Sequence, residues 1–169
     1  MKPRFQDPPP DALPMPDLNP YVREHLDFGP EVLSATQARD HAHHWDGLFG
    51  RTAPLHLEIG SGNGFYLSGM AALHPEADWL GIEIRYKRVV IAARKLRAGA
   101  LGNARIARFD GWAIAELFAP GSLAGIHINH PDPWPRRSQE HRRLIGPPLA
   151  EQAAQLLAFG GEVRLKTDF

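Results

Sequence analysis

The chain has 169 residues, the usual length of one domain, and 43% of them are hydrophobic, which is enough for a single core. Lysine plus arginine balances aspartate plus glutamate at 19 each, so the net charge indicates no particular partner, and the lack of cysteine excludes disulfides and thiolate chemistry. No secretory signal is visible and no window approaches the ~20 apolar residues of a membrane span, so we expect a cytoplasmic protein without a membrane partner.

The N-terminal part of the chain is rich in proline. Seven prolines fall within residues 1–20. Proline has no backbone N–H and interrupts helices, so we predict an extended, Pro-rich tail. Residues 21–53 form an N-terminal segment, in which Ser34 is placed to cap a short helix that runs to His44. The histidines of residues 41–44 have no acidic or cysteine partner at a suitable spacing, so we expect no metal site.

The main domain is predicted to span residues 54–169, where short apolar runs alternate with segments of helical spacing. This alternation predicts an α/β fold, a doubly wound and mostly parallel sheet with right-handed crossovers. We expect strands at Leu55–Ile59, Asp78–Ile84, Ala104–Phe109, Ala124–Asn129 and Glu162–Thr167, and helices at Tyr66–Leu73, Arg85–Ala98, 112–118 and Pro148–Leu157, the last of them stopped by Gly160 and Gly161.

The last expected strand has no visible neighbour on one side. In the strand order 3-2-1-4-5 it lies at the edge of the sheet, and the chain ends directly after it at Phe169. A bare edge strand exposes unpaired backbone groups and favours pairing with another chain. We therefore expect a sheet that lacks its C-terminal strands. The alternatives are an edge covered by the N-terminal tail or by a partner, including self-association.

The segment Leu55–Gly64 combines a short strand with a glycine-rich turn. Gly60, Gly62 and Gly64 permit positive φ angles and a close approach of a ligand to the main chain. Ligands of open α/β sheets bind at the carboxyl ends of the strands, so we predict a ligand over this turn. The spacing G-x-G-x-G differs from the dinucleotide motif, and Glu58 would repel a pyrophosphate. A cationic ligand such as S-adenosylmethionine fits Glu58 better.

Further acids follow the expected strands. Glu83 ends the second strand, where an acid commonly accepts hydrogen bonds from ribose hydroxyls, and Asp110 follows the third strand, where it could accept one from an adenine amino group. Together with the glycine turn, these acids predict a ligand that contains a nucleoside. An NAD enzyme shares the acid at Glu83, so these residues alone do not separate the two cofactors.

A proline-rich loop follows the fourth expected strand and reads Asn129-His-Pro-Asp-Pro-Trp-Pro135. Three prolines restrict its backbone and hold Asp132 and Trp134 at the rim of the sheet. A tryptophan ring can stack on a base, so the loop predicts a pocket for a planar ring; the alternative is a rigid turn with a packed Trp.

Basic residues flank this rim. Arg85 to Phe109 contains eight Lys or Arg and no acid, and further arginines follow the proline loop at positions 136, 137, 142 and 143. Two basic runs beside one site predict contacts with phosphates and favour a structured RNA as the substrate.

Taken together, LHLEIGSGNG, GIEIR, Asp110, NHPDPWPRR and GGEVRLKTDF resemble the bacterial tRNA (guanine-N7-)-methyltransferases. The resemblance covers about residues 44–169. It implies a Rossmann-like class I methyltransferase fold with a seven-stranded sheet, S-adenosylmethionine as cofactor, and methyl transfer to N7 of a guanosine in the variable loop of tRNA.

The resemblance also implies roles for single residues. Glu58, Glu83, Asp110 and Asp132 match the family's cofactor-contacting acids, and Asp132 also matches its proposed catalytic residue. Arg136 stands where the family usually has a substrate-binding Lys, and Asp168 matches a substrate-contacting Asp. His130 replaces a usual Phe, and the family's C-terminal Thr-x-x-Glu motif is absent. The remaining alternatives are a methyltransferase acting on another RNA or on an amino nitrogen, a truncated non-catalytic domain that binds cofactor or RNA, and an NAD-dependent oxidoreductase.

Overall fold

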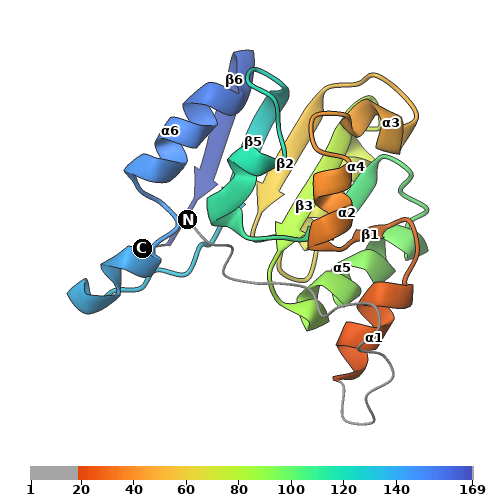
Figure 1. Cartoon of the computed structure of the whole chain (residues 1–169), viewed down its shortest axis with the longest axis horizontal. Coiled ribbons are helices and arrows are strands. Elements are labelled where there is room, and N and C mark those ends of the chain that lie inside the picture. The colour runs from red at the N-terminus through yellow and green to blue at the C-terminus, as the bar shows by residue number, and fades with distance from the viewer. Residues whose placement is uncertain (1–18, 169) are drawn as a thin grey trace.

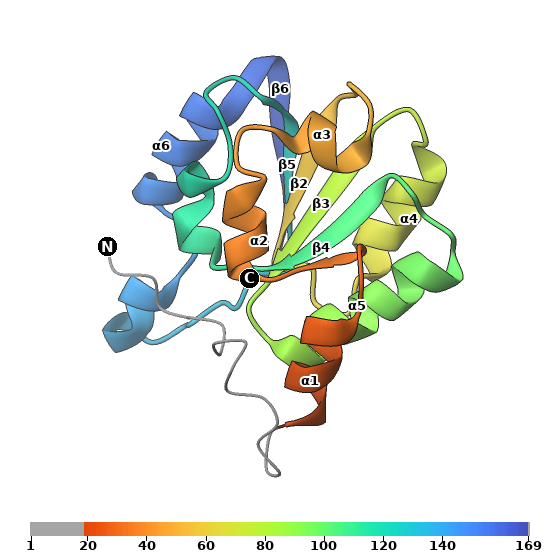
Figure 2. The same cartoon turned by 45° about the vertical axis from the view of Figure 1, so that its right-hand side comes forward.

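The computed structural model describes residues 19–168 and shows one parallel sheet with helices on both faces (Figures 1 and 2). Within these residues the sheet has six strands in the order β1-β4-β3-β2-β5-β6, and every neighbouring pair is parallel. The order 3-2-1-4-5 expected for the five strands of the main domain is confirmed. The strands are β1 Val32–Leu33, β2 Leu55–Ile59, β3 Asp78–Glu83, β4 Ala104–Arg108, β5 Leu123–Asn129 and β6 Leu157–Lys166.

The sheet separates the core into two layers, and helices cover each of them. Buried side chains from α4 and α5, with Phe28 directly after α1, form one cluster, and those from α2, α3, η2 and α6 join the other. All six residues of β3 are buried, as expected for a central strand covered on both faces. The helices are α1 Pro20–Asp27, α2 Ala35–Asp40, α3 Trp45–Phe49, α4 Phe65–Leu73, α5 Tyr86–Ala98 and α6 Pro147–Leu156, with 3-10 turns η2 Gly111–Glu116 and η3 Arg137–Arg142.

The N-terminal segment contains more structure than the single helix expected there. Ser34 caps α2 through a capping box with Gln37, as predicted, but the helix ends at Asp40 instead of reaching His44. Two further helices, α1 and α3, flank it, and β1 extends the sheet beside β4. A two-residue strand has too few residues for its alternation to be read from sequence, so pairing with β4 decides its formation. Most of the predicted Pro-rich tail, residues 1–18, lies outside the described residues.

Two arginine clasps fasten this N-terminal segment to α5. Arg94 donates to both carboxylate oxygens of Glu24, at 2.7 and 2.6 Å. Arg97 donates to both oxygens of Glu31, at 3.1 and 2.8 Å, and also to the carbonyl oxygen of Phe28. These forked pairs are the geometry in which arginine binds carboxylates best. The segment therefore packs as part of the same body as the main domain.

The prediction that Gly160 and Gly161 end the last helix is wrong. The helix ends at Leu156, and both glycines lie inside β6. Leu157 already pairs with Leu123, and the register then shifts so that Glu162 pairs with Gly125. The extra residues bulge out of the strand, and the left-handed φ of 81° at Gly160 allows this bulge.

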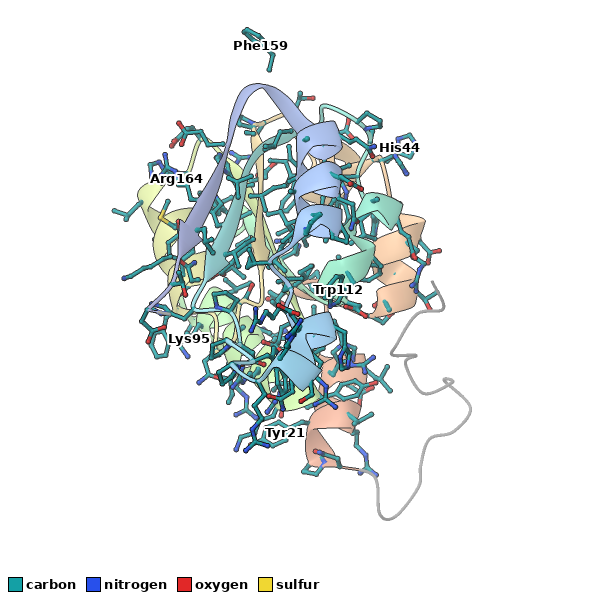
Figure 3. All side chains as sticks on the ribbon, turned by 90° about the vertical axis from the view of Figure 1, so that its left-hand side faces the viewer. Tyr21, His44, Lys95, Trp112, Phe159 and Arg164 are labelled. Atoms are coloured by element: carbon teal, nitrogen blue, oxygen red, sulfur yellow. The ribbon has the colours of Figure 1, made fainter. Side chains whose placement is uncertain are left out.

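The outer strand β6 is exposed along much of its length. Within the described residues it pairs with β5 alone. Figure 3 shows Phe159 projecting from the end of β6 and Arg164 on its surface. The expected edge position of this strand is confirmed. No helix among residues 19–168 combines the length and apolar character needed to cross a membrane.

Candidate functional site

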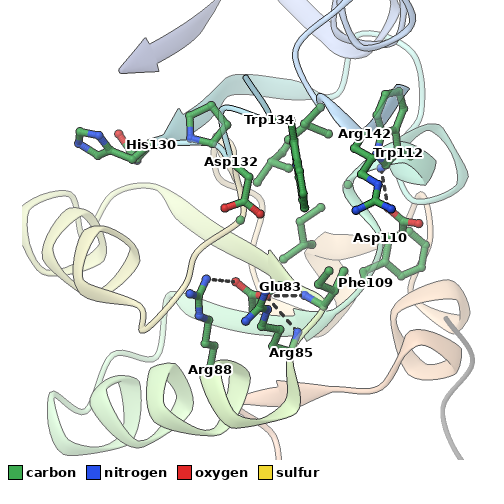
Figure 4. Close-up of a pocket in the computed structure, with 18 residues that line it drawn as sticks. Glu83, Arg85, Arg88, Phe109, Asp110, Trp112, His130, Asp132, Trp134 and Arg142 are labelled. Atoms are coloured by element: carbon green, nitrogen blue, oxygen red, sulfur yellow. Dashed lines mark hydrogen bonds and ion pairs between the residues drawn. The ribbon is translucent and has the colours of Figure 1, made fainter. Parts of the chain in front are cut away.

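An open pocket lies at the carboxyl ends of the central strands, as expected for a doubly wound sheet (Figure 4). Five of the predicted site residues line it: Gly60, Glu83, Asp110, Asp132 and Trp134. In Figure 4 the acid at the end of β3 and the proline loop after β5 lie on opposite sides of this pocket. The structure thus brings together residues that are up to 74 positions apart along the chain, Gly60 and Trp134.

The glycine-rich turn between β2 and α4 forms one end of the site. Gly60, Gly62 and Gly64 have φ angles of 77°, 54° and 75°, a region in which residues with a Cβ are strained. A Cβ on Gly64 would lie 2.5 Å from the Cβ of Ala92 in α5. The turn therefore needs glycine for its backbone conformation, and at Gly64 also for the close packing of α4 against α5. Gly62 and Gly64 shape the turn but do not line the pocket.

Glu83 is buried, and among residues 19–168 its carboxylate accepts hydrogen bonds from the main chain around it. One carboxylate oxygen accepts from the backbone N–H of Gly62 at 3.1 Å, and the other accepts from Ile84 and Arg85 at 2.9 and 3.0 Å. Arg88 lies 3.8 Å from the carboxylate and adds a favourable charge. Glu83 is therefore held rigidly at the pocket wall, where it can receive the hydroxyl groups of a ribose.

Glu58 lies beneath the glycine turn rather than on the pocket wall. Its side chain is buried, and one oxygen accepts from the amide of Asn129 at 3.2 Å. The other oxygen has no donor at hydrogen-bonding distance in the part of the chain that the structure describes. Burial raises the pKa of Glu58, while nearby hydrogen-bond donors, Asn129 first, act in the opposite direction. A cationic group bound above the turn would stabilise the charged form of this carboxylate.

Asp110 lies at the far end of the pocket, after β4. Its carboxylate accepts from the backbone N–H of Trp112 at 3.0 Å and so caps η2. Gly111, between them, packs closely on Ile59, because a Cβ there would lie 2.7 Å from a methyl group of that residue. Asp110 thus combines a local structural role with a place on the pocket wall.

The proline loop places Asp132 and Trp134 on the opposite wall. Trp134 has a left-handed φ of 40°, an unusual conformation for a residue with a Cβ. Arg143 donates to the carbonyl oxygen of Trp134 at 3.2 Å, and the guanidinium carbon of Arg142 lies 5.1 Å from the centre of its ring. These two contacts hold the ring beside the pocket, and the exposed carboxylate of Asp132 projects between Trp134 and the glycine-rich side (Figure 4).

Of the three predicted substrate residues, Trp134 lines this pocket, whereas Arg136 and Asp168 lie outside it. Arg136 lines an adjoining hollow, which we call the outer hollow. Its walls are Arg85, Asp132, Pro133, Trp134, Pro135, Arg136 and Gln139. Asp168 lies 3.5 Å from the imidazole of His130, a residue of the pocket rim, so it is near the site without lining it.

Fewer basic side chains of the run from Arg85 to Phe109 lie at the site than expected. Two of its arginines form the clasps to the N-terminal segment. Arg108 is buried, with its guanidinium carbon 4.1 Å from the ring centre of Tyr86. Arg85 and Arg88 line the pocket. The sequence showed where the positive charges are concentrated. It could not show which of these side chains pair with neighbouring acids or pack against aromatic rings.

Some pocket residues carried little signal in the sequence. Asn129 ends β5 and holds Glu58, yet a polar residue at a strand end is common. Trp112 reaches the pocket from a segment with no motif of its own, whereas Arg142 belongs to the basic residues already noted after the proline loop. Residues 19–168 contain no group of three or more His, Asp or Glu residues suited to hold a metal ion.

The chain is similar to known proteins of one family. Residues 52–169 match a family described as "Putative methyltransferase". The tRNA (guanine-N(7)-)-methyltransferase of Leuconostoc mesenteroides is 36% identical over 150 residues, which are 88% of this chain and 67% of that protein. The corresponding enzyme of Thiobacillus denitrificans is 43% identical over 85% of this chain and 60% of its own length. The chain thus spans about two thirds of the length of these relatives.

Solved structures agree on the fold. TrmN from Thermus thermophilus superimposes with a TM-score of 0.55 at 18% identity, over 85% of this chain and 36% of that chain. The aminoglycoside resistance methyltransferase NpmB1 also gives 0.55, at 19% identity, over 74% of this chain and 59% of that chain. At this level of identity the likeness concerns the arrangement of strands and helices. The sequence relatives are more specific, and by them the chain belongs to the tRNA (guanine-N(7)-)-methyltransferase family.

Proposed function

We propose that the protein transfers the methyl group of S-adenosylmethionine to N7 of a guanosine in tRNA. The observation that carries the proposal is the position of Asp132. This carboxylate lines both the pocket over the glycine-rich turn and the outer hollow beside it. A group at this junction can contact both a methyl donor in the pocket and a base that enters from the outside.

The residues of the pocket fit the parts of S-adenosylmethionine. Glu83 would accept from the ribose hydroxyls and Asp110 from the adenine amino group. Glu58, under the turn formed by Gly60, Gly62 and Gly64, would stabilise the positive charge of the amino-acid end of the cofactor. Its buried oxygen without a close donor supports this assignment, because a buried carboxylate is costly unless a cation or a donor meets it.

The reaction requires the protein to position the two reactants and does not require a general base. Guanine N7 carries a lone pair and no proton, so it can attack the sulfonium methyl group directly. A bond forms from N7 to the methyl carbon while the carbon–sulfur bond breaks, and its electron pair leaves with the sulfur. Holding donor and acceptor in line lowers the barrier. The purine gains positive charge as the methyl group arrives, and the Asp132 carboxylate would stabilise that charge.

The substrate side is assigned to the proline loop and its neighbours. Trp134 can stack on a base, Arg136 can contact the RNA, and Asp168 can accept from the N1–H and amino group of a guanine and so select that base.

The exposed edge of β6 offers a route to self-association, because its backbone groups face no further strand in the described chain.

The test is transfer of labelled methyl groups from S-adenosylmethionine to bulk tRNA by the whole chain, followed by nucleoside analysis of the product. N7-methylguanosine supports the proposal. A different methylated nucleoside would reassign the substrate, and measurable cofactor binding without any incorporation would support a domain that binds but does not turn over. Titration with NADH, monitored by fluorescence, separates the oxidoreductase alternative, since a methyltransferase pocket should not bind the reduced dinucleotide tightly.

A further inference from the structure

The outer hollow is a further concave surface at the rim of the sheet. It shares Arg85, Asp132 and Trp134 with the cofactor pocket and is more open to solvent. Its remaining walls come from the proline loop and from Gln139 in η3. A nucleotide that presents its base to Asp132 would therefore have its sugar and phosphate in or beside this hollow.

Two guanidinium groups line this hollow from separate parts of the chain. Arg85 precedes the first residue of α5, and Arg136 lies between the proline loop and η3. Both residues are exposed. Neither side chain makes a hydrogen bond or an ion pair with another residue among positions 19–168. This contrasts with Arg94 and Arg97, which share the same basic run but are paired with carboxylates.

We propose that Arg85 is a further substrate-binding residue that holds, together with Arg136, a backbone phosphate of the RNA beside the target nucleoside. The proposal rests on the proposed function. Phosphate oxygens accept well from guanidinium groups, and two such groups from different elements can hold one phosphate from two sides. The carboxylate of Asp132 in the same hollow repels a phosphate, so the anion is directed to the arginine-lined part and the base to the acid.

The position of Arg85 also explains why it was not recognised in the sequence. It follows the acid of GIEIR and looks like one member of a long basic run. Its backbone N–H donates to Glu83, and the residue lines both the cofactor pocket and the outer hollow. A side-chain substitution therefore removes the proposed phosphate contact and leaves the backbone hydrogen bond in place. Arg88, one turn further along α5, lies 3.8 Å from Glu83 and belongs to the cofactor side.

The experiment compares Arg85→Ala with Arg23→Ala, a control that removes one exposed arginine of α1 outside both hollows. For each variant, tRNA affinity is measured by filter binding at several salt concentrations, S-adenosylmethionine affinity by calorimetry, and KM and kcat by methyl transfer. We expect Arg85→Ala to weaken tRNA binding about tenfold and to reduce the slope of log affinity against log salt by about one, as for one lost phosphate contact. Cofactor affinity should fall by less than tRNA affinity, because Arg85 also lines the cofactor pocket but its backbone hydrogen bond to Glu83 is retained.

The two proposals fail in distinguishable ways. If wild-type protein forms N7-methylguanosine and Arg85→Ala binds tRNA like Arg23→Ala, the inference about Arg85 is overturned and the function stands. If Arg85→Ala weakens tRNA binding but wild-type protein forms no methylated product, the methyl-transfer proposal fails while the RNA contact stands. Loss of cofactor binding in Arg85→Ala would also overturn the inference, because it would place the side chain on the cofactor side. No tRNA binding by the wild-type chain would overturn both.

Discussion

A carboxylate oxygen of Glu83 accepts a hydrogen bond of 3.1 Å from the backbone N–H of Gly62, which joins the end of β3 to the glycine-rich turn after β2. The other oxygen of Glu83 accepts from two consecutive N–H groups just before α5, those of Ile84 and Arg85. One side chain therefore fixes the relative positions of three segments that border the pocket. It organises the cofactor site and is also our candidate for contact with the ribose.

Glu83→Gln should weaken S-adenosylmethionine binding by at least about tenfold, since hydrogen bonds to charged groups contribute about 1.5–3 kcal/mol. Each carboxylate oxygen faces N–H donors, so the amide NH2 of glutamine would meet a donor instead of an acceptor. Calorimetric titration measures the effect. Glu76→Gln, which changes an exposed acid after α4, serves as the control. Unchanged affinity in Glu83→Gln would contradict the assignment.

Asp132→Asn should lower kcat for methyl transfer by about 10² or more, the range seen when a group that stabilises transition-state charge is removed. The substitution keeps the shape of the side chain and removes its charge, so it tests the electrostatic role directly. Rapid-quench assays at saturating cofactor and tRNA measure the chemical step. Near-normal turnover, with the cofactor bound as in the wild type, would show that the Asp132 carboxylate does not stabilise the transition state.

Gly64→Ala should destabilise the protein by about 2–4 kcal/mol, because a left-handed φ costs about 1 kcal/mol and overpacking about 1–3 kcal/mol. The new Cβ would lie 2.5 Å from the Cβ of Ala92, and φ at this position is 75°. Gly69→Ala in the same helix is the matched control, since nothing lies within 4 Å of its Cβ position. Helix propensity predicts that the control gains up to about 1 kcal/mol. Urea unfolding of both variants measures the difference, and equal stability would refute the packing argument.

Buried His127 and its half-buried neighbour His56 provide a prediction about pH. His127 Nε2 lies 3.1 Å from His56 Nδ1, and His127 Nδ1 lies 2.9 Å from the hydroxyl of Tyr66. Gly125 makes room for the pair, because a Cβ there would lie 2.7 Å from His56 Nδ1. Burial, reinforced by the charge of His56 and Arg164, lowers the pKa of His127 to about 4. The folded state therefore holds this ring neutral.

Stability should fall as the pH drops from about 6.5 to about 4. In this window the unfolded state binds a proton at His127 and the folded state does not, so the folded state loses stability. A shift of this size corresponds to roughly 3 kcal/mol. Urea unfolding at several pH values, compared with His127→Gln, isolates the contribution from those of the other histidines. A wild-type profile that parallels that of the variant would exclude His127 as the source.

Much of the site could be predicted from the sequence because its residues follow strand ends. Leu55–Ile59 is an apolar run that ends in glycines, so both the strand and the turn after it were evident. Glu83, Asp110 and Asp132 come directly after or at the end of other strands, and parallel strands bring their carboxyl ends to one edge. The three prolines after the fourth strand likewise predicted a loop with a restricted backbone. The roles of these residues toward cofactor and RNA remain proposals.

The chain order of apolar runs, glycines and prolines by itself determined the α/β class, the strand order of the main domain and the motif that led to the family. The tertiary structure alone decided which charged side chains are available to bind a ligand, because ion pairing and burial depend on neighbours distant in sequence. It assigned Arg94 and Arg97 to the N-terminal segment and left Arg85 open at the outer hollow. It likewise added β1 to the sheet and placed Gly160 inside β6, since strand pairing across the sheet outweighs local preference in such short segments.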